Sequence, residues 1–154
     1  MILNRQKKVR LAVRPLVAFL GKIQRELRLE NRDVSIAFVS DAEIARWNER
    51  YRRKKGPTDV LSFPAGALSN GASRRNAGHR RRNSAAAITQ FLGDIAIAPE
   101  TARRYAKKNG RSMDAEIRVL ILHGVLHLMG YDHESDNGQM NQIEQRLRRR
   151  LGIS

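Results

Sequence analysis

Hydrophobic and polar residues follow two different spacings along the chain, and these spacings predict its helices and strands. Apolar residues three and four positions apart indicate helices, whereas short apolar runs bounded by turn residues indicate strands. The first spacing predicts helices over residues 13–31, 40–51, 99–108, 112–129 and 137–151. The second predicts strands over residues 2–3, 34–39, 59–63 and 92–98. Because these elements interleave without strict strand–helix–strand alternation, the order favours an α+β fold over a doubly wound sheet.

Residues at the ends of these elements support the assignment. Asn31 is expected to end the first helix. Ser40 and Glu43 form a capping-box sequence, in which Ser40 caps the second helix and the Glu43 carboxylate reaches back to the backbone. Ser112 is a further expected N-cap. Residues 34–39 are apolar on both faces, which predicts an inner strand that is covered on each side.

Residues 66–90 differ in kind from the rest of the chain. They are rich in Gly, Ser, Asn and Ala and contain no acidic residue. Their arginines are Arg74, Arg75, Arg80, Arg81 and Arg82. Such a composition buries too little apolar surface to hold a fixed structure without a partner. We therefore predict a mobile basic loop, with His79 as a solvated residue within it.

The charge balance adds an electrostatic expectation to a chain of single-domain length. The 154 residues include 30 Lys and Arg against 15 Asp and Glu, which gives a net charge of +15. A positive field of this size favours polyanions, so nucleic acid is the expected partner. An anionic membrane surface is the competing partner, and solubility alone is the remaining explanation.

The composition also excludes several classes of protein. The chain has no cysteine, which rules out a disulfide framework and thiolate metal sites. No apolar run approaches the roughly 18 residues of a membrane span. Residues 1–15 lack the apolar core and small-residue cleavage site of a secretion signal. We therefore expect a cytoplasmic protein with no membrane partner.

Three of the four histidines lie in the short stretch HGVLHLMGYDHE. His123 and His127 are four residues apart on one predicted helix, so their side chains project from the same face. Gly130 can end this helix with a positive φ and turn the chain, which brings His133 back to the same point. Three imidazoles leave one tetrahedral position open, as in catalytic zinc sites. The alternative is three core histidines that are satisfied by backbone hydrogen bonds.

The same spacing occurs in the metzincin proteases, whose motif is H-E-x-x-H-x-x-G-x-x-H. Gly124 stands where these proteases keep the glutamate that acts as general base. This difference argues against peptide hydrolysis and favours other chemistry at the same metal geometry. Phosphodiester cleavage needs positive charge around the phosphoryl group, and the run YRRKK (residues 51–55) offers four cations. A solvated helix end is the other interpretation of that run.

With these motifs, the chain resembles the YbeY family, the single-strand-specific metallo-endoribonucleases of bacterial rRNA maturation. Three blocks carry the resemblance, and they are NERYRRKKGPTDVLSFP (residues 48–64), LGDIAIAPETA (residues 92–102) and HGVLHLMGYDHE (residues 123–134). VSIAFVSDAEI (residues 34–44) fits the segment that precedes the first block. The similarity covers nearly the whole chain outside the basic loop, which is long for the family.

The resemblance implies an α+β fold with a small mixed sheet, four-stranded by the strands predicted here, on which about five helices pack. It implies a zincin-like metal helix and one zinc ion per chain, held by His123, His127 and His133. It also implies that Arg52 lines the cleft beside the metal and is needed for activity. The expected work is processing of rRNA near the 3′ end of the small-subunit RNA, and ribosome quality control. The expected partners are single-stranded RNA, rRNA and the ribosome or small-subunit proteins, and no DNA is expected.

Several alternatives stay open at this stage. A ribosome-assembly factor would bind through its basic residues, keep a structural zinc and have no nuclease activity. The first nucleophile is either water or a ribose 2′-OH. Three imidazoles also accept nickel, cobalt or iron. The oligomeric state and the cleavage sites are not determined by these motifs.

Overall fold

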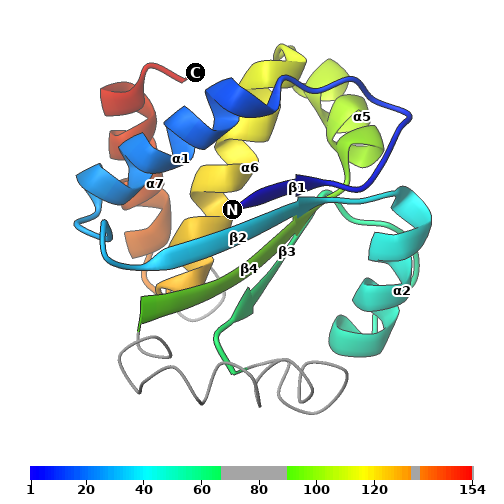
Figure 1. Ribbon diagram of the computed structural model, residues 1–154, viewed down its shortest axis with the longest axis horizontal. Coiled ribbons are helices and arrows are strands. Elements are labelled where there is room, and N and C mark those ends of the chain that lie inside the picture. Colours follow the sequence, from blue (N-terminus) through cyan, green and yellow to red (C-terminus); the bar gives the residue numbers. More distant parts are fainter. Residues whose placement is uncertain (67–89, 133–135, 154) are drawn as a thin grey trace.

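The computed structural model describes residues 1–66, 90–132 and 136–153 (Figure 1). Within these residues the chain forms four strands and five helices, which confirms the predicted α+β fold. The predicted mobile loop at residues 66–90 lies almost wholly outside the described residues, so it stays a prediction.

The four strands form one mixed sheet in the order β1-β2-β4-β3. They are β1 (Ile2–Asn4), β2 (Asp33–Phe38), β3 (Val60–Pro64) and β4 (Phe91–Ile97). β2 is parallel to both of its neighbours, whereas β3 runs antiparallel to β4 at one edge. The prediction that residues 34–39 form an inner strand is therefore confirmed. The edge position of β3 matters for function, because β3 forms part of the cleft described below.

The helices cover the two faces of the sheet unequally (Figure 1). They are α1 (Val13–Glu26), α2 (Asp41–Arg52), α5 (Pro99–Asn109), α6 (Met113–Leu128) and α7 (Gln139–Leu151). The larger core lies between the sheet and α1, α6 and α7. A smaller core lies on the other face, where α2 packs against the sheet. Most residues of α6 are buried, so this helix is a central element of the larger core.

The helix starts agree with the sequence, apart from one side chain. The hydroxyl of Ser112 accepts a hydrogen bond from the Ala115 N–H at 3.1 Å, so Ser112 caps α6 as predicted. Ser40 likewise accepts from the Glu43 N–H at 3.1 Å. The prediction for the Glu43 carboxylate was wrong, because it pairs with Arg5 at 2.9 Å. A guanidinium is a stronger partner for a carboxylate than a neutral backbone N–H.

The first helix is also shorter than predicted. It ends at Glu26 and is capped by Leu27, not at Asn31. Arg28 follows with a φ of 56°, a left-handed conformation that an α-helix cannot continue through. Among the described residues, no helix is long and apolar enough to cross a membrane.

Candidate active site

A cleft of about 810 Å³ opens at the β3 edge of the sheet. The end of α2 contributes Tyr51 and Arg52 to its lining, and residues 58–64 contribute β3 and its approach. α6 contributes His123 and His127, and the turn after α6 contributes residues 130–132. Elements that are distant in sequence therefore form one concave surface.

β3 connects the two walls of this cleft because its side chains alternate between the two faces of the sheet. Leu61 and Phe63 belong to the smaller core beneath α2. Ser62 points the other way, and its hydroxyl donates to the Gly124 carbonyl of α6 at 3.3 Å. The wall that carries Arg52 and the wall that carries the histidines therefore rest on opposite faces of one sheet.

The His123 and His127 rings meet as their spacing predicts. The ring centroids are 4.5 Å apart, and the two Nε2 atoms are 3.0 Å apart. Two lone pairs at this distance repel, so a proton or a metal ion has to lie between the rings. Two ligands of one tetrahedral zinc, each at about 2.0–2.1 Å, are roughly 3.3 Å apart. The pair therefore fits two ligands of one metal ion with a small adjustment.

A buried carboxylate orients the first of these rings. Glu144 of α7 places Oε1 3.0 Å from His123 Nδ1, and its Oε2 accepts from Arg148 at 3.3 Å. Glu144 is only 5% exposed. An ionised carboxylate accepts hydrogen bonds and donates none, so this contact puts a proton on Nδ1 and the lone pair on Nε2, the atom that faces His127. Metal-binding histidines commonly have such a carboxylate partner.

Glu144 was not among the predicted site residues, although the sequence carries a signal for it. Met140, Ile143 and Leu147 predict the buried face of α7, and Glu144 lies on the same face. A charged side chain on an apolar face requires a buried partner. That partner could not be identified from the sequence alone.

Gly124 has a structural reason that the sequence analysis did not find. A Cβ atom at this position would lie 2.8 Å from Ile95 Cδ1 and 2.9 Å from Ile95 Cγ2. A side chain here would therefore start against β4 in the core. The glycine allows α6 to lie close to the sheet, and a glutamate at this position would meet Ile95 first.

Arg52 is the last residue of α2, and it lines the same cleft as His123 and His127. Arg53 follows with a left-handed φ of 55°, which ends the helix. The buried side chain of Asn48 then donates to the Gly56 carbonyl at 2.9 Å and holds the following turn in place. The structure therefore brings Arg52 and the two histidines to one cleft.

Asp59 is a second cleft residue that the sequence analysis did not single out. It lies directly before β3, and burial raises the pKa of its carboxyl above the ordinary value of 3.8. Hydrogen bonds from the backbone and from Thr58 act in the opposite direction, but desolvation is the larger effect. The site therefore contains a carboxyl group whose environment favours the neutral form.

His133 lies outside the described residues. Gly130, which precedes it, has the expected positive φ of 99°. Within residues 1–66, 90–132 and 136–153, no cluster of three or more His, Cys, Asp or Glu side chains is arranged to hold a metal ion. The three-histidine zinc site therefore remains a prediction, supported by the geometry of its first two members.

Comparisons with known proteins concern the family and the fold of the chain. The family model described as Endoribonuclease YbeY matches residues 1–152. An Endoribonuclease YbeY of Koribacter versatilis is 37% identical over 153 residues, covering 99% of this chain and 86% of the relative. One from Nautilia profundicola is 38% identical over 125 residues, covering 81% of this chain and 76% of the relative. A solution structure of a Thermotoga maritima protein superposes with a TM-score of 0.61 at 23% identity, covering 98% of this chain and 89% of that one. This last likeness concerns the fold.

Proposed function

The chain belongs to the YbeY endoribonuclease family, and we propose that it is a metal-dependent endoribonuclease that cleaves single-stranded RNA. The observation that carries this proposal is the shared cleft of Arg52, His123 and His127. A cation and a pair of metal-type ligands on facing walls suit a phosphodiester, which has negative oxygens and a reacting phosphorus atom.

We infer that His123, His127 and His133 hold one zinc ion. Bound zinc would supply positive charge for a phosphoryl oxygen and would make a nucleophile available at neutral pH. Glu144 supports this role because it fixes the proton on His123 Nδ1 and orients Nε2 toward the cleft. Arg52 holds a phosphoryl oxygen through its guanidinium, whose planar set of donors matches phosphate geometry.

The substrate that we propose is ribosomal RNA, with maturation of the small-subunit 3′ end and ribosome quality control in the cytoplasm as its setting. The net charge of +15 supports a polyanionic partner. The names of the relatives support RNA as the polymer that is cut. The ribosome and its small-subunit proteins are further proposed partners, on the strength of the family resemblance.

The test combines metal content with cleavage of a labelled single-stranded RNA. We expect one zinc per chain in the wild type and loss of both zinc and cleavage in a folded His127→Ala variant. Arg52→Ala should keep the zinc and lose cleavage by about 100-fold or more, since it removes one charge stabiliser from the reaction. Lys55→Ala is the matched control, because Lys55 belongs to the same basic run and is exposed. End-group analysis separates the two nucleophiles, because a 2′,3′-cyclic phosphate excludes water as the first one.

Another outcome would favour a different function. Zinc and RNA binding without cleavage in the wild type would indicate a ribosome-assembly factor with a structural metal. The observation in favour of this second function is the net charge of +15, which suits binding to RNA whether or not the RNA is cut. Measured rRNA processing in cells that carry His127→Ala would distinguish the two, since an assembly factor that still folds would support processing.

A further inference from the structure

The last turn of α2 carries an aromatic ring at the wall of the cleft. Tyr51 lines the cleft and is 44% exposed. Its ring lies against Phe63 of β3 with centroids 5.4 Å apart and planes at 72°. Phe63 in turn meets Trp47 at 6.2 Å and 90°. We refer to Trp47, Tyr51 and Phe63 as the aromatic cluster.

The aromatic cluster holds the exposed ring in a fixed position. Trp47 and Phe63 pack on the smaller core between α2 and the sheet. Edge-to-face contacts of this kind stabilise a defined ring orientation. The Arg50 guanidinium lies over the Tyr51 ring, 5.5 Å from its centroid, and makes a cation–π contact with it. The protein thus keeps a large aromatic surface partly in solvent and supports it from behind.

An exposed aromatic ring next to phosphate-binding cations matches the chemistry of an unpaired nucleobase. Proteins bind single strands by stacking bases on aromatic side chains and by placing Lys or Arg along the backbone. Tyr51 and Arg50 supply these two parts, and the adjacent Arg52 is the proposed phosphate ligand. Bases in a duplex are already stacked on their neighbours, so such a ring distinguishes single strands from duplexes.

We propose that Tyr51 is a nucleobase-stacking residue, and that an unpaired base of the RNA lies on its ring beside the phosphate held by Arg52. This inference rests on the proposed function, because it assumes that the cleft takes RNA. It adds a specificity-determining residue to the cleft, and it accounts for a preference for single strands without base-specific hydrogen bonds.

The test measures binding rather than cleavage. The wild type and Tyr51→Leu are titrated into labelled single-stranded and duplex RNA of equal length, with a chelator present and RNA integrity checked on a gel. Loss of one stacked base should weaken single-strand binding by about 5- to 150-fold. Duplex binding should change by less than twofold. The salt dependence should keep its slope, because the number of neutralised phosphates is unchanged.

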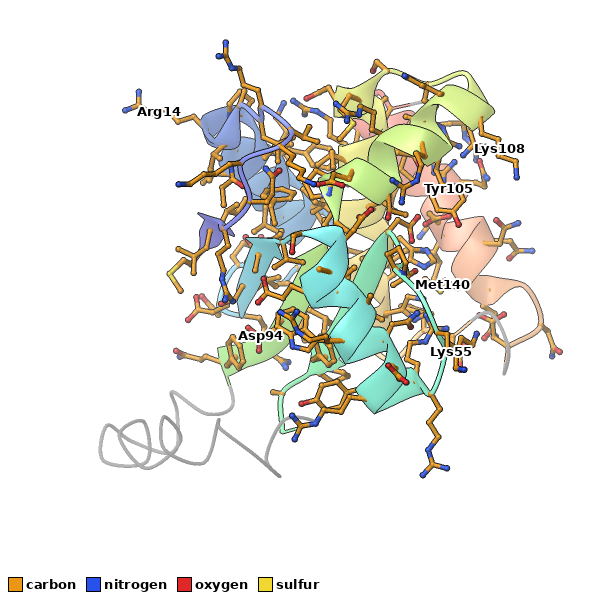
Figure 2. The ribbon with its side chains drawn as sticks, turned by 90° about the vertical axis from the view of Figure 1, so that its right-hand side faces the viewer. Arg14, Lys55, Asp94, Tyr105, Lys108 and Met140 are labelled. Atoms are coloured by element: carbon orange, nitrogen blue, oxygen red, sulfur yellow. The ribbon has the colours of Figure 1, made fainter. Side chains whose placement is uncertain are left out.

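Matched variants separate stacking from general damage. Tyr105→Leu is the control, because Tyr105 of α5 is 42% exposed, which is close to the exposure of Tyr51. In Figure 2, Tyr105 lies well apart from Lys55, which marks the C-terminal end of α2. This change should leave both affinities as they are. Tyr51→Phe keeps the ring and should bind single strands like the wild type. Thermal unfolding of each variant monitors the fold.

The possible failures can be told apart. If the wild type binds and cleaves RNA but Tyr51→Leu binds single strands as tightly as Tyr105→Leu does, only the stacking inference is overturned. If the wild type neither binds nor cleaves RNA, the proposed function itself fails. If Tyr51→Leu does not fold, an abasic oligomer decides the question with the wild type. Equal affinity for abasic and complete RNA overturns the inference, whereas weaker abasic binding supports it.

Discussion

Replacing Gly124 by alanine tests whether α6 has to lie this close to the sheet. Two effects of opposite sign act at this position. Alanine in the middle of a helix is favoured over glycine by about 0.5–1 kcal/mol, because glycine loses more backbone freedom on folding. The new Cβ, however, would approach three side-chain atoms of Ile95 at 2.8, 2.9 and 3.2 Å. Helix propensity therefore predicts stabilisation, and packing predicts destabilisation.

We expect packing to be the larger effect. Inserting a methyl group into a filled core costs typically about 1–3 kcal/mol. Ile95 is 1% exposed and lies on an inner strand, so it has little room to move away. Subtracting the helix-propensity gain leaves a net cost of about 0–2.5 kcal/mol, so Gly124→Ala should lower the free energy of unfolding by about 1 kcal/mol, near the middle of that range. Ile95→Ala removes all three contacting atoms, so in that background Gly124→Ala should become neutral or stabilising.

The assay is urea unfolding of a double-mutant cycle at Gly124 and Ile95, with a chelator present so that metal binding does not add to stability. Gly21→Ala is the matched control, because Gly21 is interior to α1 and its Cβ would meet only an Arg25 atom at 3.8 Å. This control should be stabilised by about 0.5–1 kcal/mol. If Gly124→Ala is stabilised as much as Gly21→Ala, the close-packing argument is refuted.

Three further predictions concern other contacts of the cleft. Gly93→Ala should lower the free energy of unfolding by more than Gly124→Ala does. At a φ of 152° its Cβ would collide with the Phe63 carbonyl oxygen, and a backbone atom cannot rotate away as a side chain can. Urea unfolding checks this. Glu144→Gln should weaken zinc binding by about 10- to 100-fold in a chelator competition, and unchanged affinity would remove its orienting role. Burial raises the pKa of Asp59 above 3.8. At a pH above 3.8 the folded state therefore still holds a proton that the unfolded chain has lost. The free energy of unfolding then falls as the pH rises through the folded-state pKa. Asp59→Asn should lessen this fall. Urea unfolding from pH 3 to 8 measures it, and the same dependence of stability on pH in the variant and the wild type would contradict the prediction.

The sequence predicted the elements well because the signals for them are local. Apolar spacing identified all the strands and helices of the described residues, and Ser40 and Ser112 marked two helix starts correctly. The errors came from partners distant in sequence. Ser40 and Glu43 have the sequence of a capping box, but in the folded chain the Glu43 carboxylate forms an ion pair with Arg5. A local motif cannot anticipate such a competitor.

In the candidate site, too, local features could be predicted from the sequence and contacts between distant elements could not. The spacing of His123 and His127 on one helix face is a local property, and their rings do meet. Gly124 was interpreted through its missing side chain, whereas its contact with Ile95 depends on how α6 packs on the sheet. The aromatic cluster was missed for a related reason. Its members come from two elements, and a composition with 5% aromatic residues gives no sign that three of them pack together, two of them at the cleft.

The two walls of the cleft depend on different parts of the core, and this has a consequence for the activity that we propose. The histidine wall is formed by α6, which packs on Ile95 in the larger core. Glu144 contacts His123 from beside that core. The wall with Tyr51 and Arg52 is positioned by α2 and the smaller core. Since the sheet separates these cores, metal affinity and RNA affinity should respond to separate sets of substitutions. Glu144→Gln should weaken zinc binding and leave single-strand RNA affinity measured with a chelator unchanged, whereas Tyr51→Leu should do the reverse. A variant that weakened both equally would show that the walls are coupled through β3, whose alternating side chains contact both cores.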